Sequence, residues 1–207
     1  MSNLGLGQID LMQFHVWEDD WVENEEWQRT VEDLKREGKV HAFGISVNRN
    51  EPRNVLKTLH TGLIDSVQVI YNIFEQGPED ALFPLCEELG VAVIARVPFD
   101  EGTLTGNITR ESVFEEGDWR KRYFTPENLE ASVSRAEALS KDVPEGMTMA
   151  ELALRFILHH PAVSTVIPGM RQAAHVHSNI ASSDDFTLDD ELIKTLRKHR
   201  WDRNSSI

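Results

Sequence analysis

Cysteine and basic residues are scarce in this chain of 207 residues, and each shortage excludes a class of protein. The single cysteine, Cys86, excludes an intrachain disulfide framework and a zinc site built from several thiolates. The 21 lysines and arginines are outnumbered by 35 aspartates and glutamates, so the formal net charge is −14. Nucleic acids and anionic membrane surfaces both require a basic protein surface, and we therefore expect neither as a main partner.

Long apolar runs are also missing. No window approaches the roughly 20 consecutive apolar residues of a membrane helix. The N-terminal residues Met1-Ser-Asn-Leu lack the basic and apolar regions of a secretory signal, so we expect a cytoplasmic protein. Hydrophobic residues make up 40% of the chain, which is ordinary for a globular protein with a packed core. Cys86 lies in the apolar series of an expected helix, where we predict that it packs in the core.

Five short apolar runs alternate with helical patterns along the chain, at residues 9–14, 40–45, 66–71, 91–97 and 163–167. Such alternation predicts a parallel sheet with helical connections. Helices are expected over about 27–36, over 51–61 with Asn50 as N-cap, and before Gly90. Later helices are expected to start after Thr125, after Thr148, after Gly169 and at about Thr187. Two acidic runs, 18–26 and 184–191, are interpreted as solvated surface.

The strand pattern suits either a doubly wound sheet or a (β/α)₈ barrel, and two observations favour the barrel. Gly5-Leu-Gly7 continues without a third glycine, so the dinucleotide turn of the open sheet is absent. Polar residues also gather at strand ends, where the active site of a barrel forms; they are His15, Ser46, Asn72 and Arg96. A barrel needs eight strands and about 250 residues, so we expect one incomplete TIM-barrel domain over 1–207 that lacks the first three βα units. A long loop and helix insertion is expected at 98–146.

Five motifs then occur in a specific order. They are Ile9-Asp-Leu-Met-Gln-Phe-His15-Val-Trp17, Gly38-Lys-Val-His-Ala-Phe-Gly44-Ile-Ser46, Val67-Gln68-Val-Ile-Tyr71-Asn72, Ala95-Arg-Val-Pro98-Phe-Asp-Glu-Gly102-Thr-Leu-Thr-Gly106, and Val166-Ile-Pro-Gly169 followed by Asn179. In this order and spacing the chain resembles the aldo-keto reductases. The resemblance implies strands four to eight of a (β/α)₈ barrel that binds NADP(H), needs no metal, and transfers hydride to an aldehyde or ketone. It thus implies a small carbonyl substrate.

The resemblance gives roles to polar residues at the strand ends. Taken alone, His15 could be a hydrogen-bonded core histidine; the resemblance implies that it hydrogen-bonds the carbonyl oxygen of the substrate and stabilises charge there. Gln68 lies in an apolar strand, where a buried amide requires a partner. The resemblance implies that Gln68 and Ser46 hold the nicotinamide carboxamide. The family position after this serine is commonly asparagine, whereas here Val47 precedes Asn48.

Further residues are implied to contact the rest of the cofactor. Arg96 either pairs with a neighbouring carboxylate or, as the resemblance allows, covers the nicotinamide ring or reaches the pyrophosphate. The following loop resembles the family loop along the cofactor phosphates, and its glycines permit close backbone approach. The cofactor contacts expected there are Pro98, Gly102, Leu104 and Gly106.

Arg171 gives an independent physical argument for an anion. It lies at the expected start of the helix after Gly169, where a cation is unfavourable by about 0.3–1 kcal/mol. A bound phosphate would explain it, and a solvated surface arginine is the alternative. The resemblance implies that Arg171 and Asn179 hold the adenosine 2′-phosphate of NADP(H), with His175 near the adenine; Gly169 precedes them.

The catalytic tyrosine of the family has no counterpart in the chain. The two tyrosines, Tyr71 and Tyr123, match no such motif. We therefore expect a truncated reductase that is inactive alone. A non-catalytic nucleotide-binding or partner subunit that keeps half the barrel is the alternative, and a different barrel enzyme is a third. Two open sheet edges would remain, and such edges favour self-association.

Overall fold

The computed structural model describes residues 5–184 and 186–201. Its contacts divide the chain into two compact units. The first, here called the sheet unit, holds the described residues up to Ile70 together with 77–94 and 162–165. The second, the helical unit, holds 71–76, 95–161 and the described residues from Val166 onward. The expectation of a single barrel domain stays a prediction, and each unit is treated separately below.

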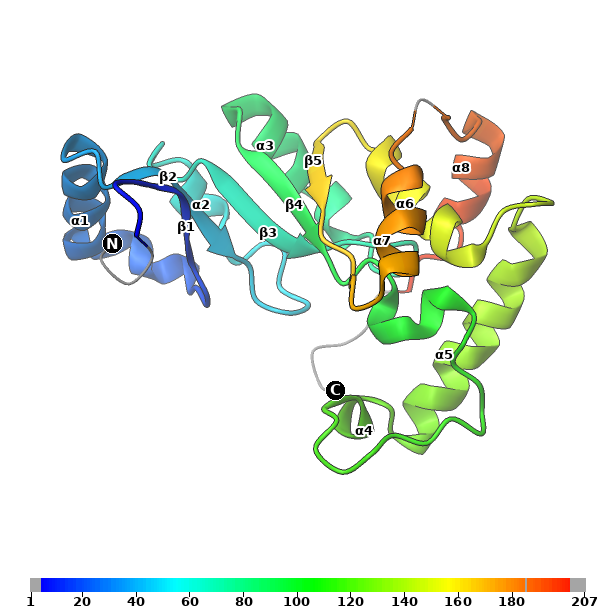
Figure 1. Cartoon of the computed structure of the whole chain (residues 1–207). Coiled ribbons are helices and arrows are strands. Elements are labelled where there is room, and N and C mark those ends of the chain that lie inside the picture. Colours follow the sequence, from blue (N-terminus) through cyan, green and yellow to red (C-terminus); the bar gives the residue numbers. More distant parts are fainter. Residues whose placement is uncertain (1–4, 185, 202–207) are drawn as a thin grey trace. The chain divides into compact units, whose positions relative to one another are not determined.

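Five strands form one sheet in the order β1-β2-β3-β4-β5, so neighbours in the chain are neighbours in space (Figure 1). Their bounds are β1 (Ile9–Phe14), β2 (Val40–Ser46), β3 (Ser66–Ile70), β4 (Ala92–Arg96) and β5 (Val163–Val166). The pairs β1–β2 and β2–β3 are parallel. The predicted α/β class is confirmed, and each strand boundary falls within one residue of its prediction. Closure of these strands into a barrel stays a prediction.

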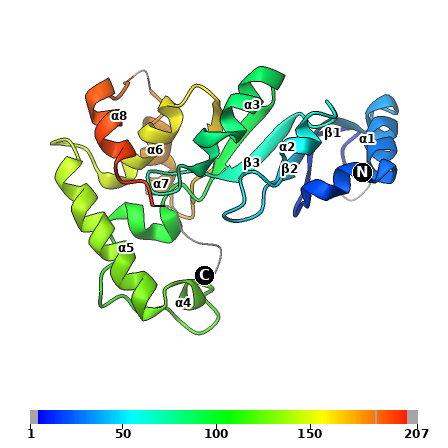
Figure 2. The same cartoon turned by 180° about the vertical axis from the view of Figure 1, so that it is seen from behind.

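The two faces of the sheet differ because successive side chains of a strand point to opposite sides. Phe14, Phe43 and every second residue along their strands lie on the face toward α1 (Glu25–Arg36). The ring centroids of Phe14 and Trp27 are 6.1 Å apart in an edge-on arrangement. This face is aliphatic and aromatic; among its residues Phe43, Ile45, Val67, Val69 and Val93 are buried. The opposite face carries the polar residues Gln13, Ser46, Ser66 and Gln68 together with aliphatic residues such as Leu11 and Ile70. Figure 2 shows the same strands and helices from behind.

The helices of the sheet unit confirm some predicted boundaries and correct one. The N-cap of α1 is Asn24, whose side chain accepts a hydrogen bond from Glu26 N. α3 (Leu82–Leu89) ends at Gly90 in the left-handed conformation, and Cys86 is buried in it, as predicted. The prediction of a helix over 51–61 was wrong, because α2 covers only Leu56–Leu59. Asn50 does not cap this helix; it has a positive φ of 59°. The unit also contains the short 3₁₀ helices η2 (Asp19–Glu23) and η3 (Gly77–Asp80).

The helical unit contains α4 (Arg120–Tyr123), α5 (Pro126–Leu139), α6 (Met149–His159), α7 (Ala173–Ala181) and α8 (Asp190–Arg197), with 3₁₀ helices η4 (Asp100–Thr105) and η5 (Ser140–Asp142). α5 and α6 begin at the predicted caps: Thr125 accepts from Asn128 N and Thr148 from Glu151 N. α8 starts later than expected, with Asp189 as its N-cap. No helix of the described residues is both long and apolar enough to cross a bilayer.

Candidate active site

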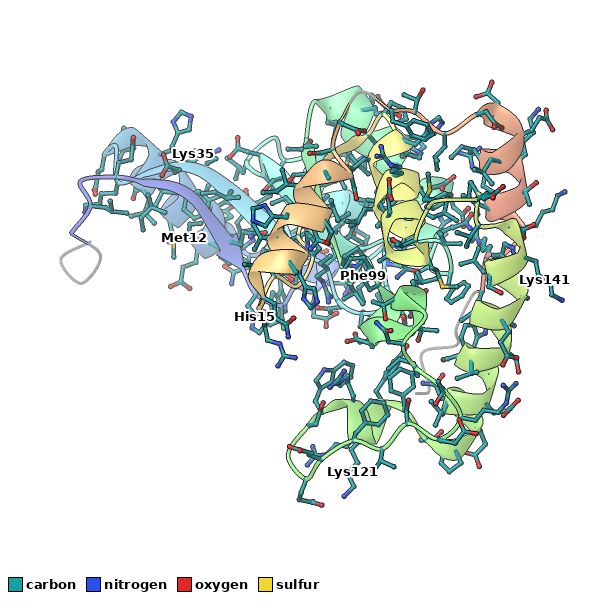
Figure 3. All side chains as sticks on the ribbon, turned by 45° about the vertical axis from the view of Figure 1, so that its right-hand side comes forward. Met12, His15, Lys35, Phe99, Lys121 and Lys141 are labelled. Carbon is teal, nitrogen blue, oxygen red and sulfur yellow. The ribbon has the colours of Figure 1, made fainter. Side chains whose placement is uncertain are left out.

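His15 lies immediately after β1, and its side chain is exposed (Figure 3). The alternative that it is a core histidine is therefore wrong. An exposed imidazole at the carboxyl end of a strand is free to meet a substrate, and it can donate or accept a hydrogen bond. Its catalytic role stays a prediction.

Ser46 and Gln68 are direct register partners on the adjacent strands β2 and β3. Both lie on the polar face of the sheet; Ser46 is buried and Gln68 is half-buried. The last residue of β2 thus places a hydroxyl beside a primary amide from the middle of β3. These groups match the hydrogen-bonding capacity of a carboxamide, which has one acceptor oxygen and two N–H donors.

Gln13 is a third polar residue on this face, and the sequence analysis missed it. Its Nε2 donates to Gln68 Oε1 at 3.4 Å, which leaves the Gln68 amide nitrogen as a donor for a ligand. The Gln13 side chain passes across its register partner Gly44, where an added Cβ would lie 3.0 Å from Gln13 Cγ. The signal was present in the sequence, because Gln13 stands between the apolar residues Met12 and Phe14.

The backbone after β4 is strained. Val97, Asp100 and Glu101 have φ of 55°, 47° and 58°, and they are three of the four non-glycine residues with positive φ in the described part of the chain. A β-branched residue in this conformation is an outlier, and such strain gathers at functional sites. Asn72 helps to hold it, because its Nδ2 donates to Val97 O at 3.0 Å.

The predicted phosphate loop follows directly. Gly102 and Gly106 have φ of 111° and 75°, which L side chains rarely adopt. Thr103 Oγ1 is buried and has no hydrogen-bond partner among the described residues. Pro98 and Leu104 are both buried, so they pack inside the helical unit. Arg96 ends β4 half-buried, and its carbonyl oxygen accepts from Tyr71 N.

Arg171 is exposed and lies just before Gln172, the N-cap residue of α7. No described side chain caps α7 through a hydrogen bond, and its first turn contains no acidic residue. Asn179 Nδ2 donates to Gly169 O at 3.3 Å, which ties the preceding loop to the helix, and His175 is exposed. A positive helix end with an adjacent arginine favours an anion.

A carboxylate also lies within electrostatic range of Arg171. The pKa of Asp118 lies below its ordinary value, chiefly because Arg120 donates hydrogen bonds to it and in smaller part because Arg171 is positive. Arg120 holds this carboxylate through Nη2 at 2.6 Å. Asp118 is therefore already neutralised by Arg120, and Arg171 makes no ion pair within the described residues.

Taken by itself, the sheet unit offers amide and hydroxyl groups suited to a carboxamide. Taken by itself, the helical unit offers glycine backbone and an exposed arginine suited to phosphate. The described residues hold no group of three or more His, Cys, Asp or Glu side chains that could bind a metal ion. Both tyrosines are buried, and Tyr123 OH donates to Asp100 Oδ1 at 3.3 Å.

Parallel α/β sheets with polar side chains at their strand ends are common in enzymes. Comparison with known proteins identifies the family. The Aldo/keto reductase family matches residues 1–200, so this chain belongs to that family of oxidoreductases. The uncharacterized oxidoreductase YqkF of Bacillus subtilis is 30% identical over 204 residues, which are 96% of this chain and 62% of that protein. The NADH-specific methylglyoxal reductase of Escherichia coli is 27% identical over 208 residues, 96% of this chain and 63% of its own length.

Solved structures agree with this assignment. The holo form of aldo-keto reductase AKR11C1 from Bacillus halodurans matches with a TM-score of 0.73 and 28% identity, covering 99% of this chain and 63% of that one. Glycerol dehydrogenase AKR11B4 from Gluconobacter oxydans, at 24% identity and a TM-score of 0.79, shares the fold over 96% of this chain and 60% of its own. The chain spans less than two thirds of the length of each of these four proteins.

Proposed function

We propose that this chain is part of an NADP(H)-dependent aldo-keto reductase that reduces an aldehyde or ketone by hydride transfer. The observation that carries the proposal is the pairing of Ser46 at the end of β2 with Gln68 on β3, in a chain of this family. When bound, the cofactor supplies the hydride. Ser46 and Gln68 hydrogen-bond the carboxamide, and His15 hydrogen-bonds the carbonyl oxygen, where negative charge develops during reduction.

The helical unit is proposed to bind the phosphates of the cofactor. Arg171 and Asn179 contact the adenosine 2′-phosphate, His175 lies near the adenine, and the backbone around Gly102 and Gly106 approaches the pyrophosphate. Support comes from the exposed arginine beside an uncapped helix start. The NADH-specific reductase of E. coli supplies the competing proposal, that NADH is preferred.

Titration of the chain with NADPH and with NADH, followed by fluorescence, tests the cofactor assignment. Arg171→Ala should weaken NADPH binding by roughly 1–3 kcal/mol, the scale of a lost charged hydrogen bond, and leave NADH binding almost unchanged. Arg29→Ala is the matched control, because Arg29 is an exposed arginine on α1 that pairs only with Glu25 among the described residues. Equal weakening for both cofactors would contradict the role of Arg171.

A second candidate function is a non-catalytic nucleotide-binding or partner subunit. The burial of both tyrosines favours it, since neither can act as the acid of the family. This candidate would be supported if the chain alone bound NADPH without turnover and if turnover appeared when a partner chain was added.

We also propose that the chain associates with itself through its outer strands β1 and β5. Light scattering after size-exclusion chromatography would detect this association as a dimer or larger species. The cytoplasmic location stays a prediction from the sequence.

A further inference from the structure

The loop that follows β1, residues 15–19, is held by two asparagines from outside it. We call these residues the His15 loop. Asn48 binds both backbone groups of Trp17: its Oδ1 accepts from Trp17 N at 3.3 Å, and its Nδ2 donates to Trp17 O at 2.7 Å. Asn54 Nδ2 donates to the same carbonyl oxygen at 3.0 Å. Both backbone polar groups of Trp17 are therefore hydrogen-bonded to side-chain amides, as they would be to the backbone of a neighbouring strand.

The far end of the His15 loop is fixed by Asp19. Its backbone nitrogen donates to Asn54 Oδ1 at 2.9 Å. Asp19 is only 8% exposed, and its carboxylate accepts three hydrogen bonds, from Lys57 N at 2.9 Å, Thr58 N at 2.8 Å and Thr58 Oγ1 at 2.7 Å. The interpretation of 18–26 as solvated surface was therefore wrong at this position. These bonds tie the loop to the first residues of α2.

The Trp17 side chain anchors the loop a third time. It is 2% exposed, and its Nε1 donates to Thr58 Oγ1 at 2.9 Å. Its ring lies 5.1 Å from Phe14 and 5.0 Å from Trp27. By contrast, the exposed His15 ring makes no hydrogen bond within the described residues. The position of His15 is thus set by the backbone on either side, in β1 and at Trp17.

We propose that Asn48 and Asn54 are positioning residues that hold His15 at the carboxyl end of β1. The proposal rests on the function proposed above, in which His15 meets the carbonyl oxygen. Asn48 is excluded as a carboxamide ligand here, because its amide nitrogen already faces Trp17 O, Glu18 Oε1 and Glu51 Oε2. Displacement of a catalytic group by about 1 Å can lower a rate by about 10²-fold, so a clamp two residues from His15 matters for chemistry.

The first test measures loop order on the 207-residue chain. Asn48→Asp keeps the size of the side chain but replaces the donor to Trp17 O with a carboxylate oxygen. Asn24→Asp makes the same exchange at an exposed N-cap, where aspartate caps equally well, and serves as the control. Backbone ¹⁵N relaxation should show Val16 falling from an order parameter of about 0.85 to below about 0.6 in Asn48→Asp only. Should Asn48→Asp fail to fold, Asn54→Asp, which spares the two Asn48 bonds, is measured instead.

The second test separates this inference from the proposed function. Turnover of an aldehyde and the Kd for NADPH are measured for the same substitutions in a form extended at its N-terminus to the length of its relatives, where Asn48→Asp should lower kcat about 10- to 100-fold without changing that Kd. A wild-type chain that does not bind NADPH would defeat the proposed function and leave the relaxation result to decide the positioning role. Unchanged order of Val16 in Asn48→Asp, or unchanged kcat with a disordered loop, would overturn the inference.

Discussion

Gly44 lies at the centre of the polar sheet face, and replacing it with alanine should disturb that face specifically. Its register partners are Gln13 on β1 and Ser66 on β3. A Cβ at this position would overlap Ser66 Oγ and lie 3.0 Å from Gln13 Cγ and 3.2 Å from Ser66 O. The hydroxyl can rotate away, but the carbonyl belongs to β3 and cannot move without distorting the strand.

The expected cost follows from this geometry. Overpacking a well-packed site costs about 1–3 kcal/mol, and Gly44→Ala should fall in that range. Ser66→Ala alone should be close to neutral or stabilising, because the buried Ser66 hydroxyl has no partner among the described residues and its desolvation is uncompensated. The double variant should recover about 0.5 kcal/mol or more of the loss, since the closest overlap is removed.

Denaturant unfolding of the four proteins measures this cycle. If Gly44→Ala and Ser66→Ala prove additive to within about 0.3–0.5 kcal/mol, the overlap with Ser66 Oγ does not cause the destabilisation. A Gly44→Ala variant as stable as the wild type would refute the argument more completely, because it would show that Gln13 and β3 adjust without cost. NADPH titration of the same variants reports whether the face carries the carboxamide contacts.

Two further predictions concern single side chains. His15→Gln should lower turnover in a complete barrel far more than it lowers the melting temperature, because the ring is exposed and packs in no core; a large drop in melting temperature with unchanged turnover would contradict this. Burial raises the pKa of the Cys86 thiol to about 12, so the nucleophilic thiolate is nearly absent at pH 8. A disulfide reagent should therefore label Cys86 only in denaturant, and rapid labelling of the native chain would show that α3 opens.

The strands were predictable because each lies in a short apolar run, and the pattern of such a run depends only on nearby residues. The caps Thr125 and Thr148 were predictable for the same reason, since each accepts a bond from a backbone nitrogen three residues on. The family resemblance then selected Ser46 and Gln68, and the register shows them to be neighbours. Local pattern and motif together therefore recovered the sheet and one group of candidate residues.

What escaped prediction depends on contacts between distant segments. The helix expected over 51–61 shrinks to α2 because Asn54 turns to Trp17 and Asp19, and Asp19 binds the nitrogens of Lys57 and Thr58. These partners are more than 30 residues apart in the chain. Asp19 stands in an acidic run where nothing in the sequence distinguishes it from its solvated neighbours. Helix propensity alone could not reveal that the Asp19 carboxylate accepts hydrogen bonds from the backbone nitrogens of Lys57 and Thr58.

The final prediction is that the 207-residue chain alone has no significant carbonyl reductase activity. Reduction leaves negative charge on the substrate oxygen, and a positioned acid that protonates it contributes about 10²–10⁴-fold. His15 can donate a hydrogen bond there, but Tyr71 and Tyr123 are 1% and 7% exposed, so neither hydroxyl can reach a substrate. NADPH oxidation with a panel of aldehydes should be compared between this chain and a form extended at its N-terminus to the length of its relatives. Equal rates would show that another residue of this chain supplies the proton, whereas turnover only in the extended form would place the acid outside these residues.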